Sequence, residues 1–175
     1  MFDSDTVKPI KELIRRYAEP ILLLTVGFPL SGKDTLISQL DLKDFYVLSR
    51  DKIMEELNPE KNYRSNYTQT DSRLTDKLFF RKMDELNKLS NNTIINATNL
   101  TKSKRRKTML RFPGYSKICL ILPDIDKESF MERNRERTLK TGKRLSDSLF
   151  EEMNSFYEKV GAEEGWDLII DLNNC

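Results

Sequence analysis

Short apolar runs alternate along the chain with longer stretches in which apolar residues recur at helical spacing. Apolar runs of about four to eight residues are typical of strands buried on both faces of a sheet, whereas apolar residues three or four positions apart are typical of amphipathic helices. The predicted strands are residues 21–26, 45–49, 93–97, 115–122 and 167–172. The predicted helices are residues 9–18, 33–40, 51–57, 70–90, 101–112, 126–140 and 146–160, and residues 58–69 are predicted to form an irregular loop.

The alternation of strands and helices predicts a parallel sheet that is covered by helices on both faces. We therefore expect a three-layer α/β fold with a sheet of about five strands. A chain of 175 residues, 38% of them apolar, suits a single domain with one core, to which residues 1–19 add an N-terminal helical extension. No apolar run approaches the ~18 residues of a membrane helix, and the N-terminal residues do not resemble a secretory signal. We expect a cytoplasmic protein with no membrane partner.

The residue types that are missing limit the chemistry. The chain has no histidine, which excludes Ser-His-Asp and Cys-His catalysis and most zinc sites. Of its two cysteines, Cys119 lies in an apolar run and Cys175 is the last residue, which suits reduced thiols better than a disulfide or a metal site. Any reaction must therefore use carboxylates, lysines, arginines and backbone amides.

Residues 27–34, GFPLSGKD, contain the spacing G-x-x-x-x-G-K between a predicted strand and a predicted helix, which is the context that this phosphate-binding motif requires. Glycines let the backbone curl so that its N–H groups and the helix N-terminus converge on an anion, and Lys33 reaches the terminal phosphates. The alternative is an ordinary glycine-containing turn with a chance lysine. The predicted ATP-binding residues are Gly27, Pro29, Ser31, Gly32, Lys33, Asp34 and Thr35.

Asp34 departs from the usual motif, which has Ser or Thr at this position to present a hydroxyl to Mg²⁺. A carboxylate is a good ligand for a hard cation, so we predict that Asp34 holds Mg²⁺ directly or through water. Without the metal, the same carboxylate repels a triphosphate. Nucleotide binding is therefore predicted to depend strictly on Mg²⁺.

Asp51 follows the second predicted strand, on the side of the sheet where parallel α/β folds bind ligands. A kinase needs a carboxylate near the phosphate loop to accept the proton of the attacking hydroxyl, and Asp51 is our candidate for this general base. The alternative is structural, because Ser49 could cap the next helix and Asp51 could complement its dipole.

Two basic segments suggest contacts with anions. Arg133 and Arg137 are four residues apart on one predicted helix, where like charges repel unless an anion lies between them. Residues from about 130 to 146 are therefore predicted to form a lid that places a guanidinium on the transferring phosphoryl group. The acidic residues of the same helix also allow an ordinary solvated surface.

The second basic segment, residues 102–111, holds six cations and no acid. Such a stripe suits the phosphodiester backbone of a nucleic acid, although a solvated helix face is the alternative. The residues that we predict to contact the nucleic acid here are Lys104, Arg105 and Arg106.

Together these segments resemble the phage and bacterial polynucleotide kinases of the P-loop kinase group. The resemblance covers residues 21–172 and is carried, in the family's order, by GFPLSGKD, SRD (49–51), ATNL (97–100), RNRER (133–137) and EGWDLII (164–170). It implies adenylate-kinase-like strand order and Mg²⁺-dependent transfer of the ATP γ-phosphate to a hydroxyl. It also implies that Lys33 binds ATP phosphates, that Asp51 is the general base and that Arg137, with Arg133, is the lid arginine. The acceptor-binding residues that we take from it are Arg50, Thr98 and Asn99.

Three positions differ from patterns that are found in the family. End-healing members often carry an arginine three residues after the general base and an acid just before T-N-L, whereas this chain has Met54 and Ala97 there; Asn96 replaces the aspartate of another variant. The missing arginine weakens charge-assisted recognition of a terminal nucleotide. It leaves open a hydroxymethyl group on a modified base, such as 5-hydroxymethyluracil in phage DNA, as the acceptor.

The default prediction is therefore an ATP- and Mg²⁺-dependent kinase whose acceptor is a 5′-hydroxyl end of DNA or RNA. Three alternatives stay open: the hydroxymethylated base just described, a small molecule or nucleotide as acceptor, and a nucleotide-binding switch without transferase activity.

Overall fold

The computed structural model of the chain describes residues 2–57, 72–142 and 144–174. The predicted loop at 58–69 lies outside the described residues, as do Lys143 of the predicted lid and Cys175. Among the described helices, none has the length and apolar character needed to cross a membrane.

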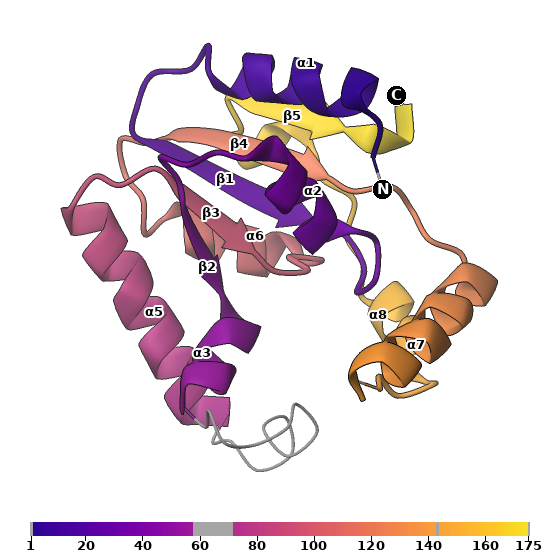
Figure 1. The fold of residues 1–175 in the computed structure, drawn as a ribbon. Coiled ribbons are helices and arrows are strands. Elements are labelled where there is room, and N and C mark those ends of the chain that lie inside the picture. The colour runs from indigo at the N-terminus through magenta and orange to yellow at the C-terminus, as the bar shows by residue number, and fades with distance from the viewer. Residues whose placement is uncertain (1, 58–71, 143, 175) are drawn as a thin grey trace.

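A parallel sheet forms the centre of the molecule (Figure 1). Its strands are β1 (Ile21–Val26), β2 (Tyr46–Ser49), β3 (Thr93–Asn96), β4 (Ser116–Ile121) and β5 (Leu168–Asp171). They lie in the order β2-β3-β1-β4-β5, and every pair of neighbours is parallel. The predicted α/β fold with adenylate-kinase-like strand order is therefore confirmed. Because all the strands point the same way, the residues that follow β1, β2 and β3 emerge at one edge of the sheet.

Helices cover both faces of the sheet, as predicted. Among the described residues, the helices with more than one turn are α1 (Ser4–Ile14), α2 (Lys33–Leu40), α3 (Arg50–Leu57), α5 (Ser72–Lys88), α6 (Lys102–Met109), α7 (Lys127–Thr141) and α8 (Leu149–Ser155). Side chains of β1 alternate between the two faces. Leu23 packs on one face with residues of α1 and α2, whereas Leu22 and Leu24 pack on the other with residues of α5 and the segment after α6. This double burial explains why β1 is a continuous apolar run.

The helices α7 and α8 stand apart from the two main layers, at the carboxyl edge of the sheet (Figure 1). They pack around a small apolar cluster of their own that includes Phe130 and Phe150. Phe28, from the loop after β1, joins this cluster, and its ring lies 5.5 Å from that of Phe150, centroid to centroid. The loop after β1 is therefore packed directly against the α7–α8 unit.

Two predicted helices have different limits. The first begins at Ser4 instead of residue 9, because Asp3 caps it by accepting a hydrogen bond from the Thr6 amide at 2.8 Å; Pro9 lies inside the helix rather than at its start. The last predicted helix, residues 146–160, spans only Leu149–Ser155. It cannot continue to residue 160 because the Glu158 amide bonds to the carbonyl of Leu100. In both places a specific hydrogen bond outweighs the apolar spacing.

Cys119 lies within β4 and is fully buried. Burial raises the pKa of its thiol to about 12, so this cysteine is unreactive at neutral pH.

Candidate active site

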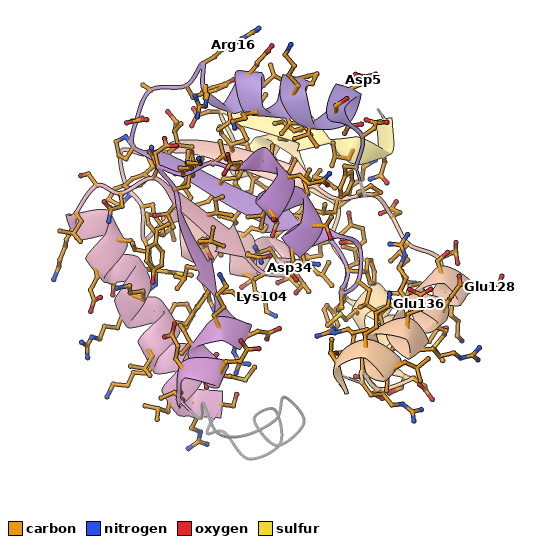
Figure 2. All side chains as sticks on the ribbon, viewed as in Figure 1. Asp5, Arg16, Asp34, Lys104, Glu128 and Glu136 are labelled. Carbon is orange, nitrogen blue, oxygen red and sulfur yellow. The ribbon has the colours of Figure 1, made fainter. Side chains whose placement is uncertain are left out.

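A cleft of about 610 Å³ lies at the carboxyl edge of the sheet. Its walls come from the loop after β1, the ends of β2 and β3, and the helices α7 and α8. Lining residues from the predicted site are Pro29, Gly32, Lys33, Asp34, Thr35, Arg50, Asp51, Thr98 and Arg137. Figure 2 shows Asp34 at the start of α2, beside the opening between α3 and α7. Residues that are far apart in the sequence thus meet in one cavity.

The loop from Gly27 to Gly32 is held in a shape that only glycine allows at two positions. A Cβ on Gly27 would lie 2.9 Å from the Cβ of Leu122, and Gly32 has a φ of 95°, in the left-handed region. Gly32 is also the N-cap of α2 and contributes no side-chain cap, so the first N–H groups of α2 have no side-chain acceptor from the cap residue. Such a helix start is suited to an anion.

Lys33 is the first residue of α2, and the loop binds its side-chain amine. Its Nζ donates hydrogen bonds to the carbonyls of Gly27, at 3.1 Å, and Phe28, and to the hydroxyl of Ser31, at 3.4 Å. Burial lowers the pKa of Lys33 to about 8, an effect that the carboxylates of Asp34 and Asp51 partly oppose. The negative charge of a bound phosphate would raise this pKa again.

Asp34 is fixed by a contact that the sequence does not reveal. Asn96, the last residue of β3, donates from its Nδ2 to Oδ1 of Asp34 at 2.6 Å. The described residues contain no group of three acidic or cysteine side chains able to hold a metal alone. The site nevertheless fits Mg²⁺, because this ion commonly binds through one or two carboxylates and the oxygens of substrate phosphates. Asp34 offers a carboxylate for this purpose, and Thr35, the next residue, offers a hydroxyl oxygen.

Asp51 and Arg50 open the helix α3 directly after β2. Asp51 lines the cleft and lies close enough to Lys33 to raise its pKa. Arg50 also lines the cleft, but its guanidinium is bound to α5: Nε donates to Asp76 at 2.7 Å and Nη2 to the hydroxyl of Ser72 at 2.9 Å. Asp51 is therefore the carboxylate from the end of β2 that faces the phosphate loop.

The predicted acceptor residues after β3 separate into two kinds. Thr98 lines the cleft, as expected for a residue beside the acceptor. Asn99 is buried and does not line the cleft; its Nδ2 donates to the carbonyl of Thr25 at 2.8 Å. The expectation that Asn99 contacts the acceptor is not supported by this geometry.

The two arginines of α7 also have different positions. Arg137 lines the cleft and lies near enough to Lys33 to affect its pKa. Arg133 is outside the cleft lining and donates from Nη1 to the carbonyl of Leu30, at the tip of the phosphate loop, at 2.9 Å. Arg133 thus links α7 to the loop, whereas Arg137 is the arginine of this pair that lines the cleft.

The six cations of residues 102–111 do not form one basic face. Arg105 is fully buried and paired with Glu164, so the prediction that it contacts nucleic acid is wrong. Lys102 pairs with Glu163 at 2.8 Å, and Arg111 with Asp84 at 2.6 Å. The exposed cations of this segment that form no ion pair with any other described residue are Lys104, Arg106 and Lys107.

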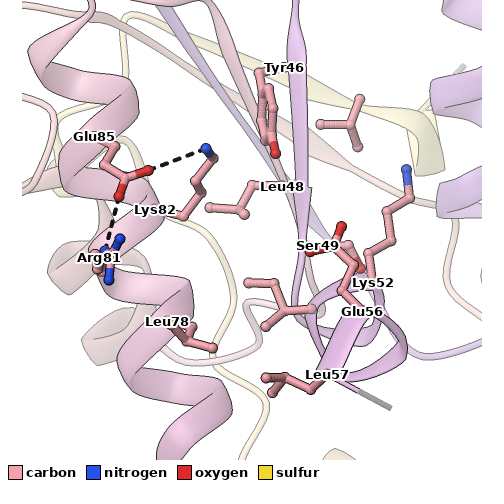
Figure 3. A pocket seen from close by; sticks show the side chains of 12 residues that line it. Tyr46, Leu48, Ser49, Lys52, Glu56, Leu57, Leu78, Arg81, Lys82 and Glu85 are labelled. Carbon is pink, nitrogen blue, oxygen red and sulfur yellow. Dashed lines mark hydrogen bonds and ion pairs between the residues drawn. The ribbon is translucent and has the colours of Figure 1, made fainter. Parts of the chain in front are cut away.

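A second groove, of about 300 Å³, lies between β2, α3 and α5 (Figure 3). Of the residues that the structure describes, only Ser49 lines both this groove and the cleft. Two of the groove's cations share one carboxylate, because Glu85 accepts from Arg81 at 3.0 Å and from Lys82 at 3.2 Å. It holds none of the residues that the sequence assigned to catalysis or to ATP.

Comparisons with known proteins agree with this geometry. A family model described as an AAA domain matches residues 22–160. No curated protein matches the chain.

Solved structures share the fold at low sequence identity. A candidate kinase from Chloroflexus aurantiacus is 16% identical, with a TM-score of 0.60 over 88% of this chain and 86% of that chain. A chain of the Pnkp1/Rnl/Hen1 RNA repair complex is 21% identical, with a TM-score of 0.62 over 79% of this chain but only 44% of that one. A chain of the PezAT toxin–antitoxin system of Streptococcus pneumoniae is 16% identical, with a TM-score of 0.58 over 98% of this chain and 78% of that chain.

Proposed function

The chain belongs to the AAA domain family and has a P-loop kinase-like fold, and on this premise we propose that it transfers the ATP γ-phosphate to a hydroxyl group on nucleic acid. The default acceptor is a 5′-hydroxyl end of DNA or RNA. One observation carries the proposal: Asp51, from the end of β2, and Lys33, from the phosphate loop, line the same cleft and interact electrostatically. A carboxylate beside a phosphate-binding lysine is the arrangement that hydroxyl phosphorylation needs.

The proposed reaction assigns a separate task to each group. The acceptor oxygen forms a bond to the γ-phosphorus while the bond from that phosphorus to the bridging oxygen breaks, and the acceptor proton passes to the carboxylate of Asp51. Lys33 and the N–H groups at the start of α2 bind the phosphate oxygens, and Arg137 adds positive charge from α7. Asp34 would hold Mg²⁺, and the ion would supply positive charge against the phosphates of the nucleotide.

Support for a nucleic-acid acceptor comes from two sources. Lys104, Arg106 and Lys107 are exposed and unpaired with any described residue, which suits contacts with a phosphodiester chain. The structural likeness to a chain from an RNA repair complex is compatible with such a substrate.

Replacing Lys104, Arg106 and Lys107 with glutamine is expected to weaken binding of a single-stranded oligonucleotide and to reduce its salt dependence. Each phosphate contact contributes about 0.7 to the slope of log K against log salt for single strands, so the slope should fall by up to about 2. The measurement is the oligonucleotide Kd from about 50 to 200 mM salt.

The matched control removes three other exposed cations, Lys8, Arg15 and Arg16, which lie on or next to α1. The apolar residues of α1 pack on one face of the sheet, and those of the segment after α6 pack on the other. Arg16 and Lys104, one cation from each variant, are labelled in Figure 2. The control variant should keep the wild-type slope. Equal slopes in both variants would exclude the α6 surface as the binding site.

Replacing Asp34 with serine should make nucleotide binding less dependent on Mg²⁺. In the wild type without metal, this carboxylate repels the triphosphate; a like-charge pair about 4 Å apart costs on the order of 4 kcal/mol at an effective dielectric of 20, before screening by salt. We expect Asp34→Ser to bind ATP about tenfold or more tightly than the wild type in EDTA.

The measurement is the Kd for ATP across a Mg²⁺ titration. Asp44→Ser, a change in the loop before β2, is the control for loss of an acidic charge. Superimposable titrations for Asp34→Ser and the wild type would remove Asp34 from the metal site.

A second acceptor is favoured by the position three residues after Asp51. Met54 is buried there, and its sulfur accepts a long contact of 3.8 Å from Arg50, whose guanidinium is already held by Asp76. This place therefore offers no free guanidinium to clamp a terminal phosphate. A hydroxymethyl group on a base in DNA, which needs no such clamp, is the second candidate.

The test of the proposed function is incubation of the protein with γ-labelled ATP and a panel of acceptors. The panel contains 5′-hydroxyl DNA, 5′-hydroxyl RNA, DNA with hydroxymethyluracil, and free nucleosides. Label on either 5′-hydroxyl polymer supports the default, and label on the modified base supports the second candidate. Label on nucleosides alone identifies a small-molecule kinase, and ATP binding with no labelled acceptor in the panel argues against the proposed transfer.

A further inference from the structure

A buried ion pair joins the helix α6 to the segment before β5. The side chain of Arg105 is fully buried and that of Glu164 is 7% exposed. They form two parallel hydrogen bonds, from Nε to Oε2 at 2.7 Å and from Nη2 to Oε1 at 2.8 Å. Apolar residues of similar volume often replace a buried ion pair with no loss of stability. Stability alone is therefore a weak reason for this pair, and its other contacts are informative.

Those contacts lead from Arg105 to the segment after β3. Nη1 of Arg105 donates to the carbonyl of Asn99 at 3.0 Å. Glu164 also accepts a hydrogen bond from the amide of Gly161 at 2.9 Å, which holds its carboxylate against the turn at residues 161–164. The guanidinium is thus a rigid link between α6, the turn at residues 161–164 and the backbone of Asn99.

Asn99 connects this link to the phosphate loop. Its Nδ2 donates to the carbonyl of Thr25 at 2.8 Å, and its backbone has a φ of 46°, in the left-handed region. One residue earlier, the carbonyl of Thr98 accepts the amide of Gly27 at 3.0 Å. The hydroxyl of Thr25 donates to the carbonyl of Ala97 at 2.9 Å. Residues 97–99 are therefore bonded to β1 on both sides of the point where it becomes the phosphate loop.

We propose that Arg105 and Glu164 are positioning residues for the nucleotide site: they hold residues 97–99, which in turn set Gly27 and place Thr98 in the cleft. This inference rests on nucleotide binding by the phosphate loop, which is part of the proposed function. Neither residue touches the nucleotide. Their effect acts through the Asn99 carbonyl and the Thr98–Gly27 hydrogen bond, and displacement by about 1 Å at such a site can reduce a rate by about 10²-fold.

The sharpest test separates positioning from stability. In the double variant Arg105→Met and Glu164→Leu, two apolar side chains replace the pair, so the charges are removed together and the fold can keep its stability. Methionine cannot donate to the carbonyl of Asn99. We expect stability in urea to stay near the wild type while the Kd for ATP rises about 10- to 100-fold.

Two single variants cover the case in which the double variant does not fold. Arg105→Lys keeps the charge, but its ammonium cannot reach both oxygens of Glu164 and the Asn99 carbonyl in the same geometry. Asn99→Gly keeps the left-handed backbone and removes only the bond to Thr25. Both should weaken ATP binding. The variant that carries both changes should bind ATP little more weakly than either single variant, because both changes break the same chain of hydrogen bonds from Arg105 through Asn99 to Thr25.

The control is Ile14→Ala, which removes a fully buried side chain from α1 and destabilises the fold. Ile14 belongs to the apolar cluster on the other face of the sheet, which includes none of residues 97–99. At a temperature where the variant is folded, it should bind ATP like the wild type. ATP affinity equal to the wild type in Arg105→Met/Glu164→Leu, or in both single variants, would show that the pair has no positioning role.

Hydrogen exchange at the Gly27 amide gives a readout that needs no ligand. This amide is bonded to Thr98, so its exchange should be faster in the Arg105 and Asn99 variants than in Ile14→Ala at matched stability. If the wild type binds no ATP, the proposed function fails, and the exchange rates still decide the positioning role. Unchanged protection of Gly27 would overturn it.

Discussion

Replacing Asp51 with asparagine is expected to slow phosphoryl transfer by about 10²–10⁴-fold while the affinity for ATP changes little. Asparagine keeps the size of the side chain but cannot accept the proton of the attacking hydroxyl. Asp51 lies at the start of α3 and lines the cleft, and its charge reaches Lys33. The loss should therefore appear in kcat rather than in binding.

The measurement is the single-turnover rate with γ-labelled ATP and the acceptor that the panel identifies, together with the Kd for ATP. Glu56→Gln is the matched control, because Glu56 is an exposed carboxylate on the same helix that lines the separate groove of Figure 3. It should leave the rate within about twofold, the range of a surface change away from the site. Wild-type turnover in Asp51→Asn would refute the assignment of the general base.

The sequence predicts the sheet well because double burial leaves a strong local signal. β1 and β4 lie inside the sheet and are buried on both faces, so each contains an apolar run, residues 21–24 in β1 and 118–121 in β4. The phosphate loop is equally visible, since Gly27 and Gly32 meet local steric demands and Lys33 follows at a fixed spacing. Features that depend on residues close together in the sequence can therefore be predicted from the sequence.

Arg105 shows where charge alone misleads. A run of six cations suggests one basic surface, but Arg105 lies three and four residues before the buried Thr108 and Met109, on the inner side of α6. That helical spacing was the available signal, and it places Arg105 on the buried face. Its partner Glu164 is 59 residues away, so the pair itself can be found only in the folded chain.

Asn96 is missed for a related reason. Its contact with Asp34 spans 62 residues and depends on β3 lying next to β1 in the sheet. In the sequence, Asn96 stands out only as a departure from a family pattern. In the structure the unusual aspartate of the phosphate loop and the asparagine of β3 are one unit, which suggests that the two departures compensate each other.

Replacing Lys33 with alanine is expected to weaken ATP binding and to reduce the transfer rate by a further factor of about 10²–10³, the loss typical of removing one group that stabilises transition-state charge. The amine is held by the carbonyls of Gly27 and Phe28 and by Ser31, so it is already positioned at the loop that receives the phosphates. Its removal deletes the positive charge and leaves the Gly27 and Phe28 carbonyls without this donor.

The pH dependence makes this prediction specific to Lys33. Its pKa in the free protein is lowered to about 8, mainly by burial, and a bound phosphate raises it again. Between these two pKa values binding takes up a proton, so the affinity for ATP should fall as pH rises above about 8, by up to about tenfold per pH unit. Lys33→Met should lose this pH dependence, whereas Lys43→Met, a change at an exposed lysine in the loop before β2, should retain it. A pH profile of ATP affinity that is the same in the wild type and in Lys33→Met would mean that the phosphates bind without Lys33, and the proposed site would have to be abandoned.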